Sequence, residues 1–149
     1  MSVDLWDGNG PVVADTSAWT AARRYPRAQA LLLTALERGE VAWCWPVRYE
    51  LVFDARGSEA IAAVDRLLEG LRELAVDRAV QRGVLSTMRE LADLGSHGAH
   101  RLPLADLTVA VAAQHAGMAV LHHDRHFERL GELLGVRTHW IAEPAWGCR

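Results

Sequence analysis

Four acidic residues in this chain are spaced so that a parallel sheet would bring their side chains to one edge. In chain order they are Asp15, Glu50, Asp106 and Asp124. The first and last follow short β-type runs, 12–14 and 119–123, and in open parallel sheets ligands bind beyond the carboxyl ends of the strands. The other two fall near the start of segments that we expect to be helical, where side chains lean over the same edge. The spacing therefore predicts one acidic cluster.

Acidic clusters of this kind have a characteristic chemistry. Hard cations such as Mg²⁺ and Mn²⁺ take oxygen ligands, and a metal held against a phosphodiester can activate a water and stabilise the leaving oxygen. Four converging carboxylates without cations would repel one another and raise some of their pKa values, so a metal ion should stabilise the fold. We therefore expect a divalent-metal site.

The prediction rests on the set of acids rather than on any single one. An aspartate at the end of a strand is more often a turn residue or a helix cap. Asp106 adds weight because it lies in the largely apolar stretch 102–111, where an unpaired charge is costly to bury. Glu50 has a similar setting, between Tyr49 and Leu51.

The composition indicates one globular domain over residues 1–149, with a core at about 11–141 and short terminal arms. No apolar run approaches the ~20 residues of a membrane span, and residues 1–7 lack the pattern of a secretory signal, so we expect a cytoplasmic protein with no membrane partner. Two cysteines, Cys44 and Cys148, are too few for a disulfide framework or a cysteine-rich zinc site.

The charged residues exclude further classes of protein. A net charge of −3 gives no overall basic footprint, so any nucleic-acid contact must be local. All 16 basic residues are arginines. The absence of lysine excludes P-loop phosphate binding and Schiff-base catalysis. Arginines that lie near the acids in sequence and could form a phosphate-binding rim are Arg23, Arg24, Arg27, Arg48, Arg101 and Arg125.

Strands and helices are predicted to alternate along the chain. Apolar β-type runs predict strands over 11–15, 41–45, 72–76, 118–122 and 136–141. Apolar periodicity and stop signals predict helices over 17–25, 27–38, 46–56, 58–71, 77–94, 103–117 and 125–134. The 77–94 helix should begin with Asp77 as its cap and bury Val80, Val84, Leu85, Met88, Leu91 and Ala92. Such alternation implies right-handed crossovers and an α/β fold with a mainly parallel sheet of four or five strands.

Four segments of the chain match, in order, the motifs of the PIN-domain nucleases. Residues 12–18 resemble the opening strand of that family with its first aspartate, and 49–51 resemble the helix that carries a glutamate. Residues 104–110, with the Ala-rich helix that follows, resemble the third motif, and 120–127 resemble the fourth. The sequence is most similar to the VapC toxins of bacterial toxin–antitoxin pairs, over about residues 11–141.

The resemblance implies a three-layer PIN-like fold and a divalent-metal-dependent endoribonuclease that cleaves RNA phosphodiester bonds, as the toxin of a type II toxin–antitoxin system. It implies Mg²⁺ or Mn²⁺ as the cofactor, an acidic quartet of Asp15, Glu50, Asp106 and Asp124, and hydroxyl support from Thr16 and Ser17, for which a helix N-cap is an equal alternative. We assign metal binding to Asp15, Asp106 and Asp124, and assign to Glu50 completion of the acidic site or orientation of the attacking water. A homodimer and a small VapB-like antitoxin that occludes the site are implied as partners.

Histidines near the fourth acid are a departure from the family pattern. His122 and His123 stand where relatives usually have Thr or Ser, and with Asp124 and His126 they suggest a transition-metal site. Neighbouring side chains of a strand point to opposite faces, so the first two histidines cannot both face one metal without a bend. We expect one to pack and the other to lie near the site.

Other activities are disfavoured on particular residues. Receiver domains and haloacid-dehalogenase phosphatases also place an aspartate after the first strand, but they normally use a lysine, which this chain lacks. A non-toxin PIN nuclease, or a catalytically weak RNA-binding or assembly module, stays open as the alternative. Replacement of one of the four acids would favour an RNA-binding or assembly module, but all four acids are present.

The tryptophans are expected to serve the core or interfaces. Trp43 and Trp45 should alternate with Cys44 in the second strand, as core or interface residues rather than base-stacking platforms. Trp6 and Trp146, in the terminal arms, are candidates for contacts with a dimer partner or an antitoxin.

Overall fold

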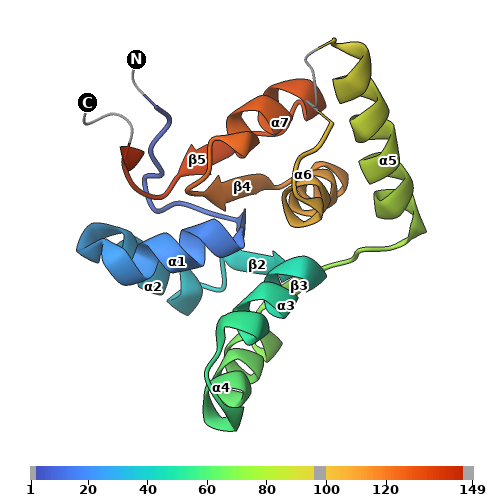
Figure 1. Ribbon diagram of the computed structural model, residues 1–149. Coiled ribbons are helices and arrows are strands. Elements are labelled where there is room, and N and C mark those ends of the chain that lie inside the picture. Colours follow the sequence, from blue (N-terminus) through green and yellow to red (C-terminus); the bar gives the residue numbers. More distant parts are fainter. Residues whose placement is uncertain (1–2, 96–99, 146–149) are drawn as a thin grey trace.

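The computed structural model describes residues 3–95 and 100–145, which form a five-stranded, all-parallel sheet with seven helices (Figure 1). The strands are β1 (Val12–Ala14), β2 (Val41–Cys44), β3 (Arg72–Leu74), β4 (Ala119–His122) and β5 (Thr138–Trp140). The helices are α1 (Thr16–Arg24), α2 (Pro26–Glu37), α3 (Trp45–Asp54), α4 (Ser58–Glu69), α5 (Arg78–Asp93), α6 (Leu104–Ala116) and α7 (His126–Leu134). The expected α/β fold with its parallel sheet is confirmed.

The central strands are buried on both faces, which explains their continuous apolar runs. No residue of β1 is more than 1% exposed, and β4 is buried over 120–122. β1 pairs with β2 on one side and with β4 on the other, where Ala14 stands opposite Leu121. Strands in this position carry small and branched apolar side chains without alternation.

The sheet order, β3-β2-β1-β4-β5, reverses its direction of winding between β1 and β4. The chain runs outward from β1 through β2 to β3 and then returns through α5 and α6 to β4, on the other side of β1. Because crossovers between parallel strands are right-handed, the helices of the two halves cover opposite faces of the sheet. Figure 1 shows α1 and α2 on one side and α6 and α7 on the other. A ligand is expected at this reversal, beyond the carboxyl ends of β1 and β4.

Helix boundaries follow local signals in the sequence. Pro26 and Pro46 lie in the first turns of α2 and α3, where a missing backbone N–H costs nothing. Asp77 caps α5 as predicted, because its Oδ1 accepts a hydrogen bond from the Val80 backbone N–H at 3.0 Å. Gly117 ends α6 in the left-handed conformation, at a φ of 64°, and turns the chain into β4. Within the described ranges, no helix is long and apolar enough to cross a membrane.

Two predictions about tryptophans are wrong. Trp45 is the first residue of α3 rather than the end of a strand, and it is 59% exposed, because the helix that contains Pro46 begins one residue earlier than expected. Trp6 is buried and not part of a free arm, because its backbone N–H binds the carbonyl of Trp140 at the end of β5. It therefore cannot contact a partner. Trp146 lies outside the described residues.

Candidate metal centre

The four acids predicted from the sequence line one cavity of about 360 Å³. Asp15 follows β1, Asp124 follows β4, Glu50 lies in α3 and Asp106 lies in the first turn of α6. The cavity is completed by Thr16, Ser17, Thr20, Ala21, Arg24, Tyr25, Pro103 and His123. Four segments far apart in the sequence therefore meet where the reversal of the sheet creates a binding position.

Asp15 caps α1 and leaves one oxygen free. Its Oδ2 accepts hydrogen bonds from the Ser17 backbone N–H at 3.0 Å and from the Ser17 hydroxyl at 2.6 Å. Its Oδ1 is buried and has no hydrogen-bond partner among the residues that the structure describes, although Asp15 lines the cavity. A buried carboxylate oxygen without a partner is costly, and a cation in the cavity would offset that cost.

The raised pKa values of two carboxylates also indicate that the site favours a bound cation. The pKa of Asp15 is raised from 3.8 to about 7, chiefly by burial, with Asp106 and Glu50 adding repulsion against the two hydrogen bonds from Ser17. Burial also raises the pKa of Asp106, while a hydrogen bond with His126 acts in the opposite direction. Both carboxylates are thus destabilised as anions in the absence of a cation.

Among the described residues, Asp106, Asp124 and His126 bring their possible metal-ligand atoms close together. The Nδ1 of His126 lies 2.7 Å from Asp106 Oδ2 and 3.4 Å from Asp124 Oδ1. The His126 backbone N–H also donates to Asp124 Oδ1, at 3.0 Å, which fixes that carboxylate at the start of α7. One ligand atom from each residue lies within 4.8 Å of the others. The three could hold one metal ion.

Glu50 reaches the cavity from α3 and is oriented by a different hydroxyl. The Thr16 hydroxyl donates to Glu50 Oε1 at 2.8 Å, whereas Ser17 supports Asp15. The two neighbouring hydroxyls thus serve two different acids, a division that the sequence alone did not indicate. The Ser17 hydroxyl oxygen also accepts the backbone N–H of His123 at 2.9 Å, which ties the start of α1 to the end of β4.

The two adjacent histidines have separate environments, as the alternation of a strand requires. His122 is fully buried, with its ring 4.8 Å from that of Trp140, and burial lowers its pKa to about 3. His123 lines the cavity, where its Nε2 lies 3.1 Å from the carbonyl oxygen of Glu143. The histidine that joins the acids is instead His126, which the sequence suggested as part of a transition-metal site but not as a member of the acidic site. Its spacing, two residues after the fourth acid at a helix start, was the available signal.

The predicted arginine rim is only partly formed around the cavity. Arg24 lines the cavity. Arg48 instead donates to Asp65 at 2.7 Å, and Arg125 borders a separate cavity. Among the six arginines considered, Arg24 is thus the one placed to meet a phosphate group in the acidic cavity.

A match to the PIN domain family model over residues 12–133 accounts for this combination of fold and site. The chain belongs to the PIN-domain family. Its curated relatives include Ribonuclease VapC18 of Mycobacterium tuberculosis, 32% identical over 127 residues, which are 85% of this chain and 92% of the relative. Ribonuclease VapC21 of the same organism is 27% identical over 120 residues, 80% of this chain and 86% of the relative.

Solved structures of VapBC proteins share the fold. A DNA-bound VapBC structure from Salmonella typhimurium aligns with a TM-score of 0.69 at 19% identity, covering 90% of this chain and all of that chain. VapBC-5 from Mycobacterium tuberculosis, described as a member of a family of toxin-antitoxin systems, aligns with a TM-score of 0.55 at 22% identity, covering 87% of this chain and 97% of that chain. At these identities the likeness extends to the fold alone.

Proposed function

We propose that this PIN-domain protein is a VapC-type ribonuclease, the toxin of a toxin–antitoxin pair, which cleaves RNA with the help of a divalent metal ion. The observation that carries the proposal is the convergence of four carboxylates on one cavity, where a buried Asp15 oxygen has no hydrogen-bond partner among residues 3–95 and 100–145. The curated relatives named above are ribonucleases, and they match most of the chain. Mg²⁺ or Mn²⁺ fits the oxygen-rich donor set.

The side chains divide the work of hydrolysis among them. Asp15, Asp106 and Asp124 would hold the ion, which would supply Lewis acidity toward a phosphodiester and help to activate the attacking water. Glu50, fixed by the Thr16 hydroxyl, orients the attacking water from the side of α3. Arg24 binds a phosphate oxygen of the RNA at the rim of the cavity.

Cleavage of a mixed RNA pool tests the proposal directly. Purified protein should cut RNA with Mg²⁺ or Mn²⁺ and not with EDTA, and Asp15→Asn should abolish the cutting. Asn can still cap α1, so this substitution removes the negative charge while keeping the helix start. Glu59→Gln, at an exposed acid of α4 outside the cavity, is the matched control and should cut normally. No cutting by folded, antitoxin-free, metal-loaded protein would redirect the assignment to an RNA-binding or assembly module.

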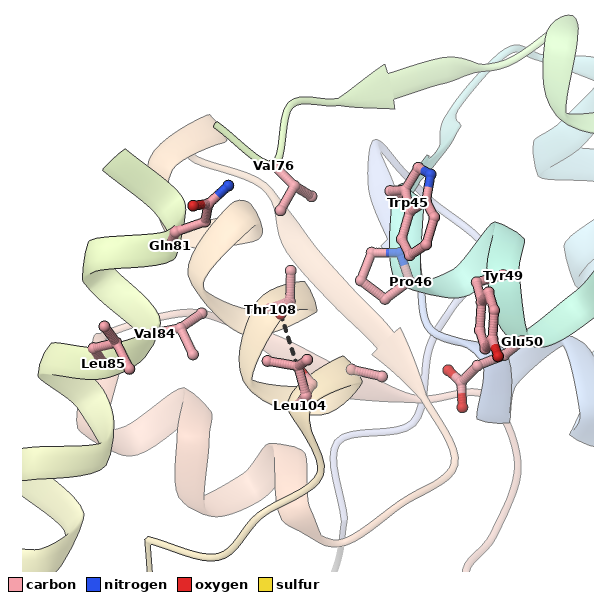
Figure 2. A pocket seen from close by; sticks show the side chains of 11 residues that line it. Trp45, Pro46, Tyr49, Glu50, Val76, Gln81, Val84, Leu85, Leu104 and Thr108 are labelled. Carbon is pink, nitrogen blue, oxygen red and sulfur yellow. Dashed lines mark hydrogen bonds between the residues drawn. The ribbon is translucent and has the colours of Figure 1, made fainter. Parts of the chain in front are cut away.

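An apolar groove of about 680 Å³ lies beside the acidic cavity and suits a protein partner. Figure 2 shows α3 side chains on one wall and those of α5 and the start of α6 on the other. Its lining residues are Trp45, Pro46, Tyr49, Glu50, Val76, Gln81, Val84, Leu85, Leu104, Ala105 and Thr108. Glu50 is the one acid among them, so the groove offers almost no charge to RNA and a large apolar surface to protein.

The same face carries a protruding ladder of aromatic rings. The rings of Trp45 and Tyr49 are 5.7 Å apart, those of Tyr49 and Phe53 are 6.1 Å apart, and all three side chains are exposed. A ridge and a hollow on one face can fit each other across a two-fold axis, because each copy supplies both. The proposed homodimer forms through this face. A small VapB-like antitoxin is the second proposed partner, in keeping with the VapBC structures that share the fold.

A further inference from the structure

One ligand-type atom in the acidic site is not an oxygen. His126 begins α7 and places its Nδ1 between two carboxylates, 2.7 Å from Asp106 Oδ2 and 3.4 Å from Asp124 Oδ1. Asp15 independently indicates a place for a cation, since its buried Oδ1 lacks a partner within the described ranges and the residue lines the same cavity as the two carboxylates.

The separations fit coordination around one ion. His126 Nδ1 lies 2.7 Å from Asp106 Oδ2 and 3.4 Å from Asp124 Oδ1, and one ligand atom of each residue lies within 4.8 Å of the others, so one ion could contact all three side chains. The His126 side chain is 35% exposed and borders a second cavity of about 840 Å³, so the ring lies between that cavity and the two carboxylates. An imidazole can bind a metal through either ring nitrogen, which makes Nδ1 a possible ligand.

We propose that His126 Nδ1 is a metal ligand and that it makes the site prefer Mn²⁺ to Mg²⁺. Imidazole nitrogen suits first-row transition metals, whereas Mg²⁺ favours oxygen ligands and gives up its waters reluctantly. Three carboxylates alone would accept either ion, so the nitrogen decides between them. The inference rests on the proposed metal-dependent ribonuclease, and it narrows the identity of the ion at that same site.

Pulsed electron paramagnetic resonance of the Mn²⁺-loaded full chain tests the ligand without measuring activity. The unmodified protein should show ¹⁴N modulation from a directly bound imidazole, and labelling with ¹⁵N-histidine should change that modulation to the ¹⁵N pattern. His126→Asn should abolish it, because an amide oxygen then stands near the Nδ1 position. The labelling arm uses the unaltered chain, so the test holds even where the variant folds poorly.

Binding titrations with Mn²⁺ and Mg²⁺ test the preference. The ratio of the Mg²⁺ to the Mn²⁺ dissociation constant should fall by about tenfold in His126→Asn. His123→Asn is the matched control, because His123 also borders the cavity but its Nε2 lies near a backbone carbonyl, and that variant should keep both the modulation and the ratio.

Failure of the inference is distinct from failure of the proposed function. Absence of ¹⁴N modulation in the unmodified protein, its persistence in His126→Asn, or an unchanged ratio would each overturn the role of His126. Any of these outcomes is compatible with metal-dependent RNA cleavage that Asp15→Asn abolishes, in which case the ion is held by oxygens alone.

Discussion

The Asp15 carboxylate both caps α1 and offers a free oxygen to the cavity. One oxygen caps α1 through Ser17, and the other is buried in the cavity without a partner in the described part of the chain. The cap fixes the side chain in a single orientation, so the free oxygen is held ready for a cation rather than being ordered when one arrives. The free energy needed to bury the Asp15 charge would therefore be offset when a cation binds.

Stability of the metal-free protein should depend on pH through Asp15. A carboxyl whose pKa rises from 3.8 in the unfolded chain to about 7 in the folded one stabilises the fold at low pH, and that contribution is lost as the pH rises from about 4 to about 7. With EDTA present, the melting temperature should be lower at pH 8 than at pH 5. Asp15→Asn should reduce this fall, and added Mn²⁺ should reverse it at pH 8. An equal fall in the variant would contradict the assignment to Asp15.

The acids of the site could be predicted from the sequence, whereas the sequence suggested His126 only as part of a transition-metal site and did not show which way its ring points. Each acid follows a strand or opens a helix, which are positions that the alternating α/β pattern already defines. The role of His126 depends instead on the tight turn after β4, where Asp124 Oδ1 accepts the backbone N–H of His126 and draws the ring toward Asp106. Spacing alone does not reveal which way that ring points.

The sequence predicted strands well where both faces of the strand are buried. The strands β1 and β4 are buried on both faces, so their apolar runs identify them, and Asp77 marks the start of α5. The periodicity of α5 predicts that Leu85 and Ala92 are buried, and this is wrong for both. Ala92 is exposed, and Leu85 is 58% exposed on the wall of the apolar groove. Periodicity tells which side chains share a helix face, but it does not tell whether another part of the same chain covers that face.

The Ser17 hydroxyl links α1 to the end of β4 through hydrogen bonds beside the acidic site. Its hydroxyl donates to Asp15 and accepts the backbone N–H of His123, so it joins the start of α1 to the end of β4. Ser17→Ala should lower the free energy of unfolding by about 1–3 kcal/mol, because a part-buried N–H and a carboxylate oxygen both lose a partner. Urea denaturation at pH 8 measures this change, with Ser86→Ala at an exposed position of α5 as the control. Equal effects of the two substitutions would exclude the joining role.

At the scale of the whole molecule, the apolar groove and the aromatic ladder leave a large apolar surface without cover. Five of the eight exposed large apolar side chains in the described ranges gather on the α3 and α5 side of the molecule: Trp45, Tyr49, Phe53, Leu85 and Leu104. Gathering of this kind is typical of surfaces that are buried in an assembly.

Disruption of the groove should separate the proposed homodimer. Leu85→Arg puts a charge on an apolar wall, so the molar mass measured by light scattering should fall from that of two chains to that of one. Leu33→Arg on α2 is the matched control, since Leu33 is similarly exposed, at 54%, but lies outside the groove. A single-chain mass for the unmodified protein at micromolar concentration would contradict the dimer.

Glu50 belongs to the walls of both the acidic cavity and the apolar groove. In the groove a neutral side chain would pack better, and in the cavity the carboxylate bound by Thr16 is needed. Natural selection therefore acts on Glu50 for two separate functions. As related sequences diverge, substitutions that adapt the groove to a new protein partner can occur at any of its other lining residues. At Glu50 they are limited, because its carboxylate is also needed in the acidic cavity.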